Sequence, residues 1–216
     1  MIPSIHEEVI ITDGNNSLTG ELHILKYTKS VIIFSHGSGS SRYSKRNQQV
    51  AKYLQKNGHG TLLFDLLTEK EDINYQNRFD IDLLSKRLII ATQWLENKKE
   101  TKDYSIGYFG ASTGAAAALT AAAYLPQIKA VVSRGGRPDL AKEKLSTVKA
   151  ATLLIVGSLD TEVVQLNIKA YKQLNCEKKI EIVEGATHLF EEIGKMEIVS
   201  VMADKWFEKY LSTAKV

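Results

Sequence analysis

Short apolar runs alternate with longer stretches along this chain, and the two kinds of segment predict different elements. Runs typical of β-strands occupy residues 7–12, 18–25, 31–34, 61–66, 105–109, 130–133, 152–156 and 179–183. Apolar residues at helical spacing, or a nearly unbroken apolar run, predict helices over residues 44–57, 80–98, 115–125, 162–174 and 195–211. The turn residues Asp13-Gly14-Asn15-Asn16 predict that the first two strands form an antiparallel hairpin.

The order of these elements predicts the fold class. After the hairpin, strands and helices alternate, which is typical of a mostly parallel sheet with helices on both faces. We therefore expect an α/β protein with an eight-stranded sheet, formed as a single domain by residues 1–216. In such sheets, functional side chains follow the carboxyl ends of the strands. Residues 134–151, between the sixth and seventh strands, are too few for a large cap domain, so we expect an open site.

Composition and charge narrow the possible functions. The 216 residues include 28 lysines and arginines and 25 aspartates and glutamates, which gives a net charge of +3. Because this small excess is spread along the chain, we expect no nucleic-acid partner. Residues 1–11 carry Glu7 and Glu8 and do not follow the pattern of a signal peptide. The apolar stretch 115–125 is too short to cross a bilayer, so we also expect no membrane partner.

Cysteine and histidine usage bears on the compartment and on metal binding. The only cysteine, Cys176, excludes an intramolecular disulfide and is consistent with a reducing compartment. The five histidines are scattered and do not form a pattern of metal ligands. We therefore expect a cytoplasmic protein without a metal or cofactor, either a monomer or a small homo-oligomer.

The pattern Gly110-Ala111-Ser112-Thr113-Gly114 lies between a predicted strand and a predicted helix. This is the context of a nucleophile elbow, in which a sharp turn presents a serine hydroxyl above the edge of the sheet. A tight turn needs small neighbours, and the two glycines supply them. The backbone N–H of Thr113 would then lie at the start of a helix, where free donors and the helix dipole stabilise an oxyanion. The alternative is a glycine-rich turn used only for helix–sheet packing.

A serine needs a base, and the base needs an orienting acid. His188 follows the last predicted strand and is the best candidate base, whereas His6, His23 and His59 fall on the hairpin or at the opposite edge of the sheet. Asp160 follows the strand 152–156 and is the best candidate acid. Its alternatives are Glu162, which would open the next helix, and Asp139, after an earlier strand. The chain order Ser112, Asp160, His188 is that of α/β-hydrolases.

The loop after the third strand, His36-Gly37-Ser38-Gly39-Ser40-Ser41-Arg42, is expected to supply a second oxyanion donor. We assign this donor to the backbone N–H of Ser38, with Gly37 or Gly39 as alternatives one position away. His36 is expected to pack and hydrogen-bond within the loop instead of acting as a base. The loop lacks the lysine and the following serine or threonine of a phosphate-binding P-loop.

Arginines also follow predicted strands on the catalytic edge. We consider Arg42 and Arg134 as contacts for an anionic group of the substrate, because the guanidinium fork suits a carboxylate. Arg78 and Arg137 lie in comparable loops. The alternative is that these arginines form structural ion pairs, for example with Asp65 or Asp139.

Four motifs together resemble the α/β-hydrolase superfamily, and within it the dienelactone hydrolase-like branch. They are His36-Gly37-Ser38-Gly39, Gly110-Ala111-Ser112-Thr113-Gly114, Gly157-Ser158-Leu159-Asp160 and Gly185-Ala186-Thr187-His188. The resemblance covers essentially the whole chain and implies an α/β-hydrolase fold with hydrolase activity. Dienelactone hydrolases use a cysteine nucleophile, whereas a serine stands here and Cys176 lies far downstream. This departure favours a carboxylesterase over a dienelactone hydrolase.

The sequence therefore predicts a serine hydrolase that cleaves small or medium acyl esters through an acyl-enzyme intermediate. Its partner would be a small-molecule ester. A thioesterase, a peptidase or an acyltransferase could use the same three residues, and the motifs do not separate these activities. A binding protein that has the fold without the activity is the remaining alternative.

Overall fold

The computed structural model describes residues 4–28 and 30–211. These residues form one eight-stranded sheet in the order β1-β2-β4-β3-β5-β6-β7-β8. β1 and β2 pair antiparallel, β2 pairs antiparallel with β4, and the remaining neighbours are parallel. The strands are β1 (Ile5–Asp13), β2 (Asn16–Ile24), β3 (Ser30–Ser35), β4 (His59–Phe64), β5 (Ser105–Ala111), β6 (Ala130–Arg134), β7 (Ala151–Gly157) and β8 (Lys178–Val183). The predicted mostly parallel α/β sheet is confirmed.

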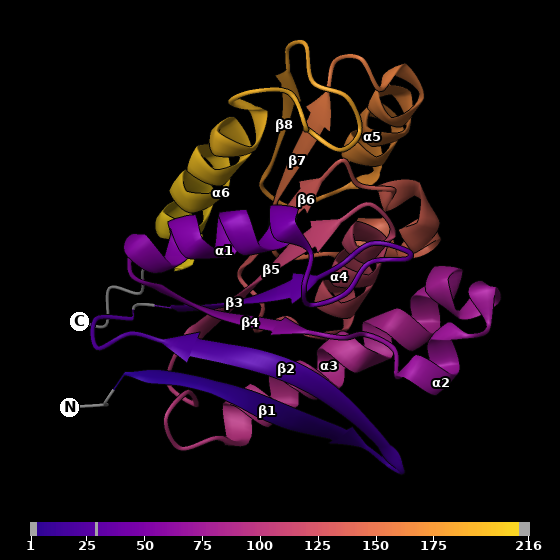
Figure 1. Cartoon of the computed structure of the whole chain (residues 1–216). Coiled ribbons are helices and arrows are strands. Elements are labelled where there is room, and N and C mark those ends of the chain that lie inside the picture. Colours follow the sequence, from indigo (N-terminus) through magenta and orange to yellow (C-terminus); the bar gives the residue numbers. More distant parts are fainter. Residues whose placement is uncertain (1–3, 29, 212–216) are drawn as a thin grey trace.

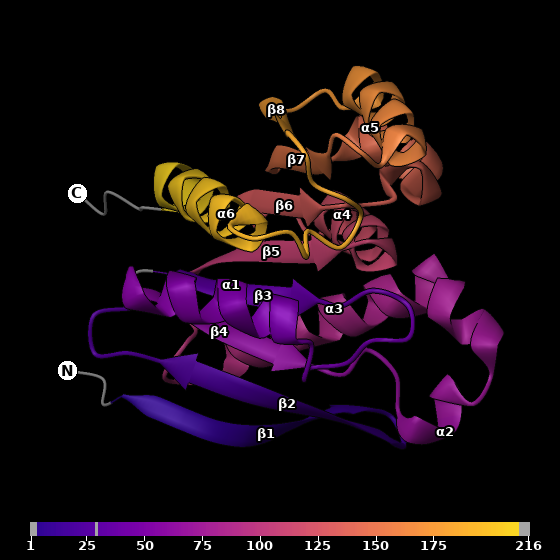
Figure 2. The same ribbon diagram turned by 45° about the horizontal axis from the view of Figure 1, so that its top comes forward.

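Helices cover both faces of the sheet (Figures 1 and 2). They are α1 (Lys45–Lys56), α2 (Glu69–Asp72), α3 (Ile81–Asn97), α4 (Thr113–Tyr124), α5 (Thr161–Gln173) and α6 (Lys195–Leu211), with the 3₁₀ segments η1 (Tyr75–Phe79) and η2 (Pro138–Thr147). α1 and α6 pack on one face, and α3, α4 and α5 pack on the other. No large cap is present over the carboxyl ends of the strands in the described part of the chain.

Each face has its own apolar core. α1 and α6 bury Val50, Leu54 and Phe207 against the inward side chains of β3 and β5, such as Phe34 and Phe109. On the other face α4 lies at the centre and is buried along almost its whole length, because it is built mostly of alanine and packs between α3 and η2. The short side chains let this helix approach the sheet closely. The nucleophile candidate Ser112 immediately precedes it.

Two features of the first half of the chain differ from the sequence prediction. β4 begins at His59 instead of residue 61, and it lies between β2 and β3. Between β4 and α3 the chain also forms α2 and η1, which the hydrophobic pattern does not predict. α2 is a single turn with a capping box, in which Thr68 Oγ1 accepts from Glu71 N–H at 3.2 Å and the Glu71 carboxylate accepts from Thr68 N–H at 2.9 Å.

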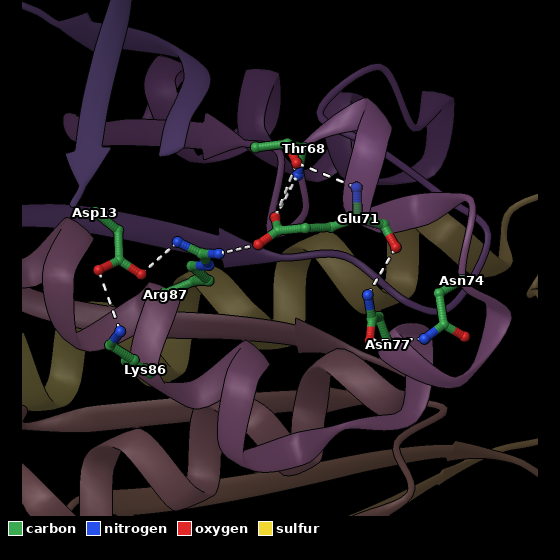
Figure 3. Close-up of polar contacts among 7 residues, drawn as sticks. All are labelled: Asp13, Thr68, Glu71, Asn74, Asn77, Lys86 and Arg87. Atoms are coloured by element: carbon green, nitrogen blue, oxygen red, sulfur yellow. Dashed lines mark hydrogen bonds and ion pairs between the residues drawn. The ribbon is translucent and has the colours of Figure 1, made fainter. Parts of the chain in front are cut away.

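A buried arginine joins the segment of α2 and η1 to the sheet (Figure 3). Arg87 on α3 is 1% exposed, and its guanidinium binds Asp13 at the end of β1 and Glu71 on α2. Lys86 also contacts Asp13, at 3.2 Å, and Asn77 Nδ2 donates to the carbonyl of Glu71 at 2.8 Å. The hairpin, α2 and η1 are therefore fixed to α3 by one connected set of polar contacts.

None of the helices in the described part of the chain is long and apolar enough to cross a membrane.

Candidate active site

Ser112 lies on the sharp turn between β5 and α4. Its backbone has φ 51° and ψ −122°, a conformation that costs a residue with a Cβ about 1–3 kcal/mol. The surrounding backbone leaves no room for a side chain two residues before or after Ser112, and the turn is possible because both of these residues are glycines. A Cβ at Gly110 would lie 2.5 Å from Ala115 Cα, and one at Gly114 would lie 2.3 Å from Ser35 O. The chain therefore has the local geometry of a nucleophile elbow.

The structure brings together the three residues that the sequence singles out. His188 Nε2 lies 3.3 Å from Ser112 Oγ, and His188 Nδ1 lies 2.6 Å from Asp160 Oδ2. The His188 side chain is 36% exposed and that of Asp160 is 17% exposed. A base in contact with both a hydroxyl and an orienting carboxylate is the arrangement required to activate a serine.

The loops that hold Asp160 and His188 are bonded to each other. Asp160 follows β7 and is the residue before α5, and its N–H donates to Gly157 O at 3.1 Å. Ser158 Oγ accepts from the Gly185 N–H at 2.8 Å, and the Leu159 N–H donates to Ala186 O at 3.0 Å. These contacts fix the acid and the base relative to each other without using either side chain.

The other candidates for the acid and the base lie elsewhere or have other partners. Asp139 accepts two hydrogen bonds from Arg137, and Glu162 lies in the first turn of α5. His6 and His23 face each other across the hairpin, with ring centroids 4.8 Å apart. His59 is a buried strand residue whose Nδ1 lies 2.7 Å from Ser30 Oγ.

His36 fixes the start of the loop after β3. Its Nδ1 lies 3.0 Å from Gly37 O, and its Nε2 accepts from the Leu66 N–H at 3.1 Å. Burial lowers the pKa of His36, so the ring is neutral, donates through Nδ1 and accepts through Nε2. A Cβ at Gly37 would lie 3.1 Å from Ser112 Cβ, which shows how closely this loop approaches the nucleophile candidate.

The two residues predicted to supply oxyanion donors, Ser38 and Thr113, are in contact, which the sequence does not reveal. Ser38 N–H donates to Thr113 Oγ1 at 2.9 Å. The Thr113 N–H is in the first turn of α4, where a helix supplies no acceptor of its own. Thr113 therefore joins the loop after β3 to the start of α4 through its side chain.

Gly135, directly after β6, holds a position that the sequence analysis did not single out. Its φ is +51°, and a Cβ there would lie 2.9 Å from His188 O and 3.6 Å from His188 Nδ1. The pair Gly135-Gly136 is visible in the sequence, but only the fold shows that the first of them packs against the imidazole loop.

The arginines have structural surroundings that differ from the predicted substrate contacts. Arg42 binds Asp65 through Nη1 at 2.5 Å, and Nη2 donates to the Tyr43 hydroxyl at 2.6 Å. Arg137 is paired with Asp139. Arg134 is only 3% exposed and points into the protein toward α1, where Nη2 lies 3.4 Å from Asn47 Oδ1. In this structure neither Arg42 nor Arg134 reaches out toward a substrate above Ser112, because the first is engaged by an acid and the second is covered.

No group of three or more potential metal ligands lies close enough together to hold a metal ion among the residues described.

Comparison with known proteins shows the family to which the chain belongs. The model of the dienelactone hydrolase family matches residues 24–213. The chain belongs to the dienelactone hydrolase family. A crystal structure of a dienelactone hydrolase from Anabaena variabilis is 48% identical, with a TM-score of 0.93, and the match covers 96% of this chain and 99% of that one.

More distant structures share the fold alone. The protein Est1E from Butyrivibrio proteoclasticus is 15% identical with a TM-score of 0.80, and the match covers 94% of this chain and 98% of Est1E. A Pyrococcus furiosus esterase is 19% identical with a TM-score of 0.77, and the match covers 96% and 92% of the two chains. These likenesses, with the family match, confirm the predicted α/β-hydrolase fold.

A curated relative carries a different name. A Mycobacterium tuberculosis protein named "Putative phosphoribosyl transferase" is 49% identical over 210 residues, which cover 97% of this chain and 47% of the relative. The chain thus spans about half the length of the curated relatives that it matches.

Proposed function

We propose that this member of the dienelactone hydrolase family is a serine hydrolase that cleaves carboxylic esters of small or medium size. The observation that carries the proposal is the hydrogen-bonded series Ser112–His188–Asp160 at the nucleophile elbow. The esterase named above, which shares the fold, and the 48% identical dienelactone hydrolase support hydrolysis of an ester bond.

In the proposed reaction, Ser112 Oγ attacks the ester carbonyl while His188 Nε2 takes the hydroxyl proton. Asp160 holds the imidazole with its proton on Nδ1 and stabilises the imidazolium that forms. The imidazolium then protonates the departing alcohol, which leaves an acyl group on Ser112. A water molecule, deprotonated by the same histidine, attacks the acyl group and restores the serine.

The negative charge on the carbonyl oxygen would be stabilised by the N–H groups of Ser38 and Thr113. In the present structure the first of these donates to Thr113 Oγ1. We propose that the substrate oxygen takes the place of this hydroxyl, which requires only a rotation about the Cα–Cβ bond of Thr113. Loss of one such donor typically lowers kcat by about 10²–10³-fold.

The surroundings of the site support a substrate with an apolar part. Leu159, beside the proposed acid, and Leu189, beside the proposed base, are both exposed. The imidazole itself is more than one-third exposed. An open site with apolar neighbours suits a small or medium acyl chain and does not enclose a long one.

The proposal is tested with a fluorophosphonate probe and with p-nitrophenyl acetate. Wild-type protein should be labelled once per chain and should hydrolyse the ester. Ser112→Ala should lose labelling and lose several orders of magnitude in turnover. Ser146→Ala, which alters an exposed serine on η2, is the matched control and should behave as wild type. Ordinary turnover by folded Ser112→Ala would refute the assignment.

The same three residues could serve a thioesterase, a peptidase or an acyltransferase. A panel of an oxygen ester, its thioester, its amide and an ester with an added acceptor alcohol distinguishes these activities by kcat/KM. A folded wild-type protein that is neither labelled nor active would favour the binding-protein alternative. We do not extend the phosphoribosyl transferase name to this chain, because the geometry of Ser112 and His188 supports acyl transfer and the named protein is about twice as long.

A further inference from the structure

Arg134 is a buried cation that has no anionic partner among the residues the structure describes. Its side chain leaves the end of β6 on the face covered by α1 and α6, and the residue is 3% exposed. One weak contact, from Nη2 to Asn47 Oδ1 at 3.4 Å, is its only side-chain hydrogen bond within the described part of the chain. Its Nε–H is buried and makes no hydrogen bond. Buried charges in native proteins are nearly always paired, because an isolated one is strongly destabilising.

A second arginine, Arg46, precedes Asn47, the residue that Arg134 contacts. Arg46 is on the first turn of α1, and its charge lowers the pKa of Arg134. Its Nε–H is also buried without a hydrogen bond to the residues described. Its Nη1 donates to Glu191 at 2.8 Å, and its side chain is 34% exposed. Arg134 and Arg46 thus each have a buried donor without a partner among the residues described, and Arg46 reaches the surface.

The Arg134 guanidinium is charged at neutral pH. Burial, and then the charge of Arg46, lower the pKa of Arg134 to about 10, which still leaves it protonated at pH 7. Within residues 4–28 and 30–211, the only carboxylate that contacts either arginine is that of Glu191, which is bonded to Arg46 and is itself largely exposed. Arg134 has no compensation from the residues described.

We propose that Arg134 and Arg46, together with Asn47, bind a small anion, either a carboxylate or a tetrahedral oxyanion such as phosphate. Paired guanidinium forks suit both groups. The anion would reach the site along the exposed side of Arg46, with Glu191 moving aside. The proposal goes beyond the proposed ester hydrolysis, since binding of the anion requires no turnover.

The site lies directly behind the candidate catalytic residues. The carbonyl of Arg134 accepts from the Ser112 N–H at 3.2 Å, and the next residue, Gly135, packs against His188. Glu191 belongs to the segment that follows His188. A bound anion would therefore contact the end of β6 and displace Glu191 in the segment after His188 at the same time.

Binding is tested by thermal unfolding of Ser112→Ala protein, which separates this result from that of the hydrolysis test. The protein is dialysed into a buffer with a bulky organic anion and titrated with sodium phosphate or sodium acetate at constant ionic strength. At about five times the Kd, a saturable rise in Tm of about 2–4 °C is expected. Arg46→Gln and Arg134→Gln should each abolish the rise. Lys45→Gln, which removes an exposed charge from the same turn, should keep it.

Several results would overturn the proposal. One is the absence of a saturable rise in Tm with either phosphate or acetate. Another is an equal loss of the rise in Lys45→Gln, which would show a general effect of surface charge. A rise that is present only in Glu191→Gln would show that Glu191 itself is the counter-ion. Because Arg46 is partly exposed, Arg46→Gln remains informative even if Arg134→Gln does not fold.

The source of the anion is distinguished by kinetics on a neutral ester and its carboxylated analogue. If the substrate carboxylate occupies the site, phosphate should raise KM for the carboxylated ester alone. If a free anion occupies it, phosphate should change kcat for both esters alike. Either effect should vanish in Arg46→Gln, and persistence of the effect in that variant would contradict the site.

Discussion

Replacing Gly114 by alanine tests whether close contact between α4 and β3 positions the nucleophile. A Cβ at this residue would lie 2.3 Å from Ser35 O and 2.4 Å from His36 O. Ordinary contacts between carbon and a carbonyl oxygen are about 3.3 Å or longer. The start of α4 would therefore have to move by about 1 Å, and Ser112 would move with it.

Two opposing effects decide the stability of Gly114→Ala. Alanine in a helix is favoured over glycine by about 0.5–1 kcal/mol. Overpacking of a rigid core costs about 1–3 kcal/mol, and here the clashing atoms are backbone carbonyls that cannot rotate away. The cost of the clash should exceed the gain in helix propensity, and Tm should fall by roughly 2–8 °C. A displacement of 1 Å at a reacting group lowers turnover by about 10²-fold.

The assay is kcat for p-nitrophenyl acetate together with Tm for wild type, Gly114→Ala and Ala123→Gly. The last variant lies near the end of α4 and loses helix propensity without touching the elbow, so its Tm should fall while its kcat is retained. Gly114→Ala with wild-type kcat would show that the position of Ser112 does not depend on this contact.

Three further predictions concern single residues. Asp160→Asn should lower kcat by about 10⁴-fold while the fold is kept, because the amide favours the wrong tautomer of His188, and pre-steady-state kinetics should place the loss in acylation. Arg87→Met should cost about 3–5 kcal/mol in urea unfolding, since Glu71 would lose its ion-pair partner and Asp13 would keep only the exposed Lys86, and a loss below 1 kcal/mol would contradict this role. Burial lowers the pKa of His36, so the unfolded chain takes up a proton that the folded chain does not. The stability from the neutral ring is therefore full above pH about 6.5 and is lost as the pH falls toward the folded pKa, and urea unfolding at pH 7.5 and 5.5 should show a smaller difference in His36→Gln.

Much of the fold could be predicted from the sequence because most of its strands are buried on both faces. Such strands are continuous apolar runs bounded by polar turns, and the runs at 31–34 and 152–156 are typical. The order in which strands pair is set by contacts between distant segments, so the position of β4 between β2 and β3 leaves no local signal. α2 and η1 are too short for helical periodicity, and α2 is held by Arg87, which also binds Asp13 far away in the chain.

In the candidate site, too, some features could be predicted from the sequence and others could not. Ser112, Asp160 and His188 could be placed because each follows a strand whose end the pattern marks. The roles of the arginines could not be predicted, since a guanidinium on a loop can pair with many acids. The sequence does not show that Arg134 turns inward beneath α1.

The backbone conformation of Ser112 has a consequence for the stability of the protein. Its φ and ψ belong to a region that glycine enters without steric cost, whereas serine must be forced into it by the packing of α4 against the sheet. Selection for a robust fold alone would place glycine at this position. Serine therefore has a conformational cost here that glycine would not have, and the close packing of α4 against the sheet holds it in place.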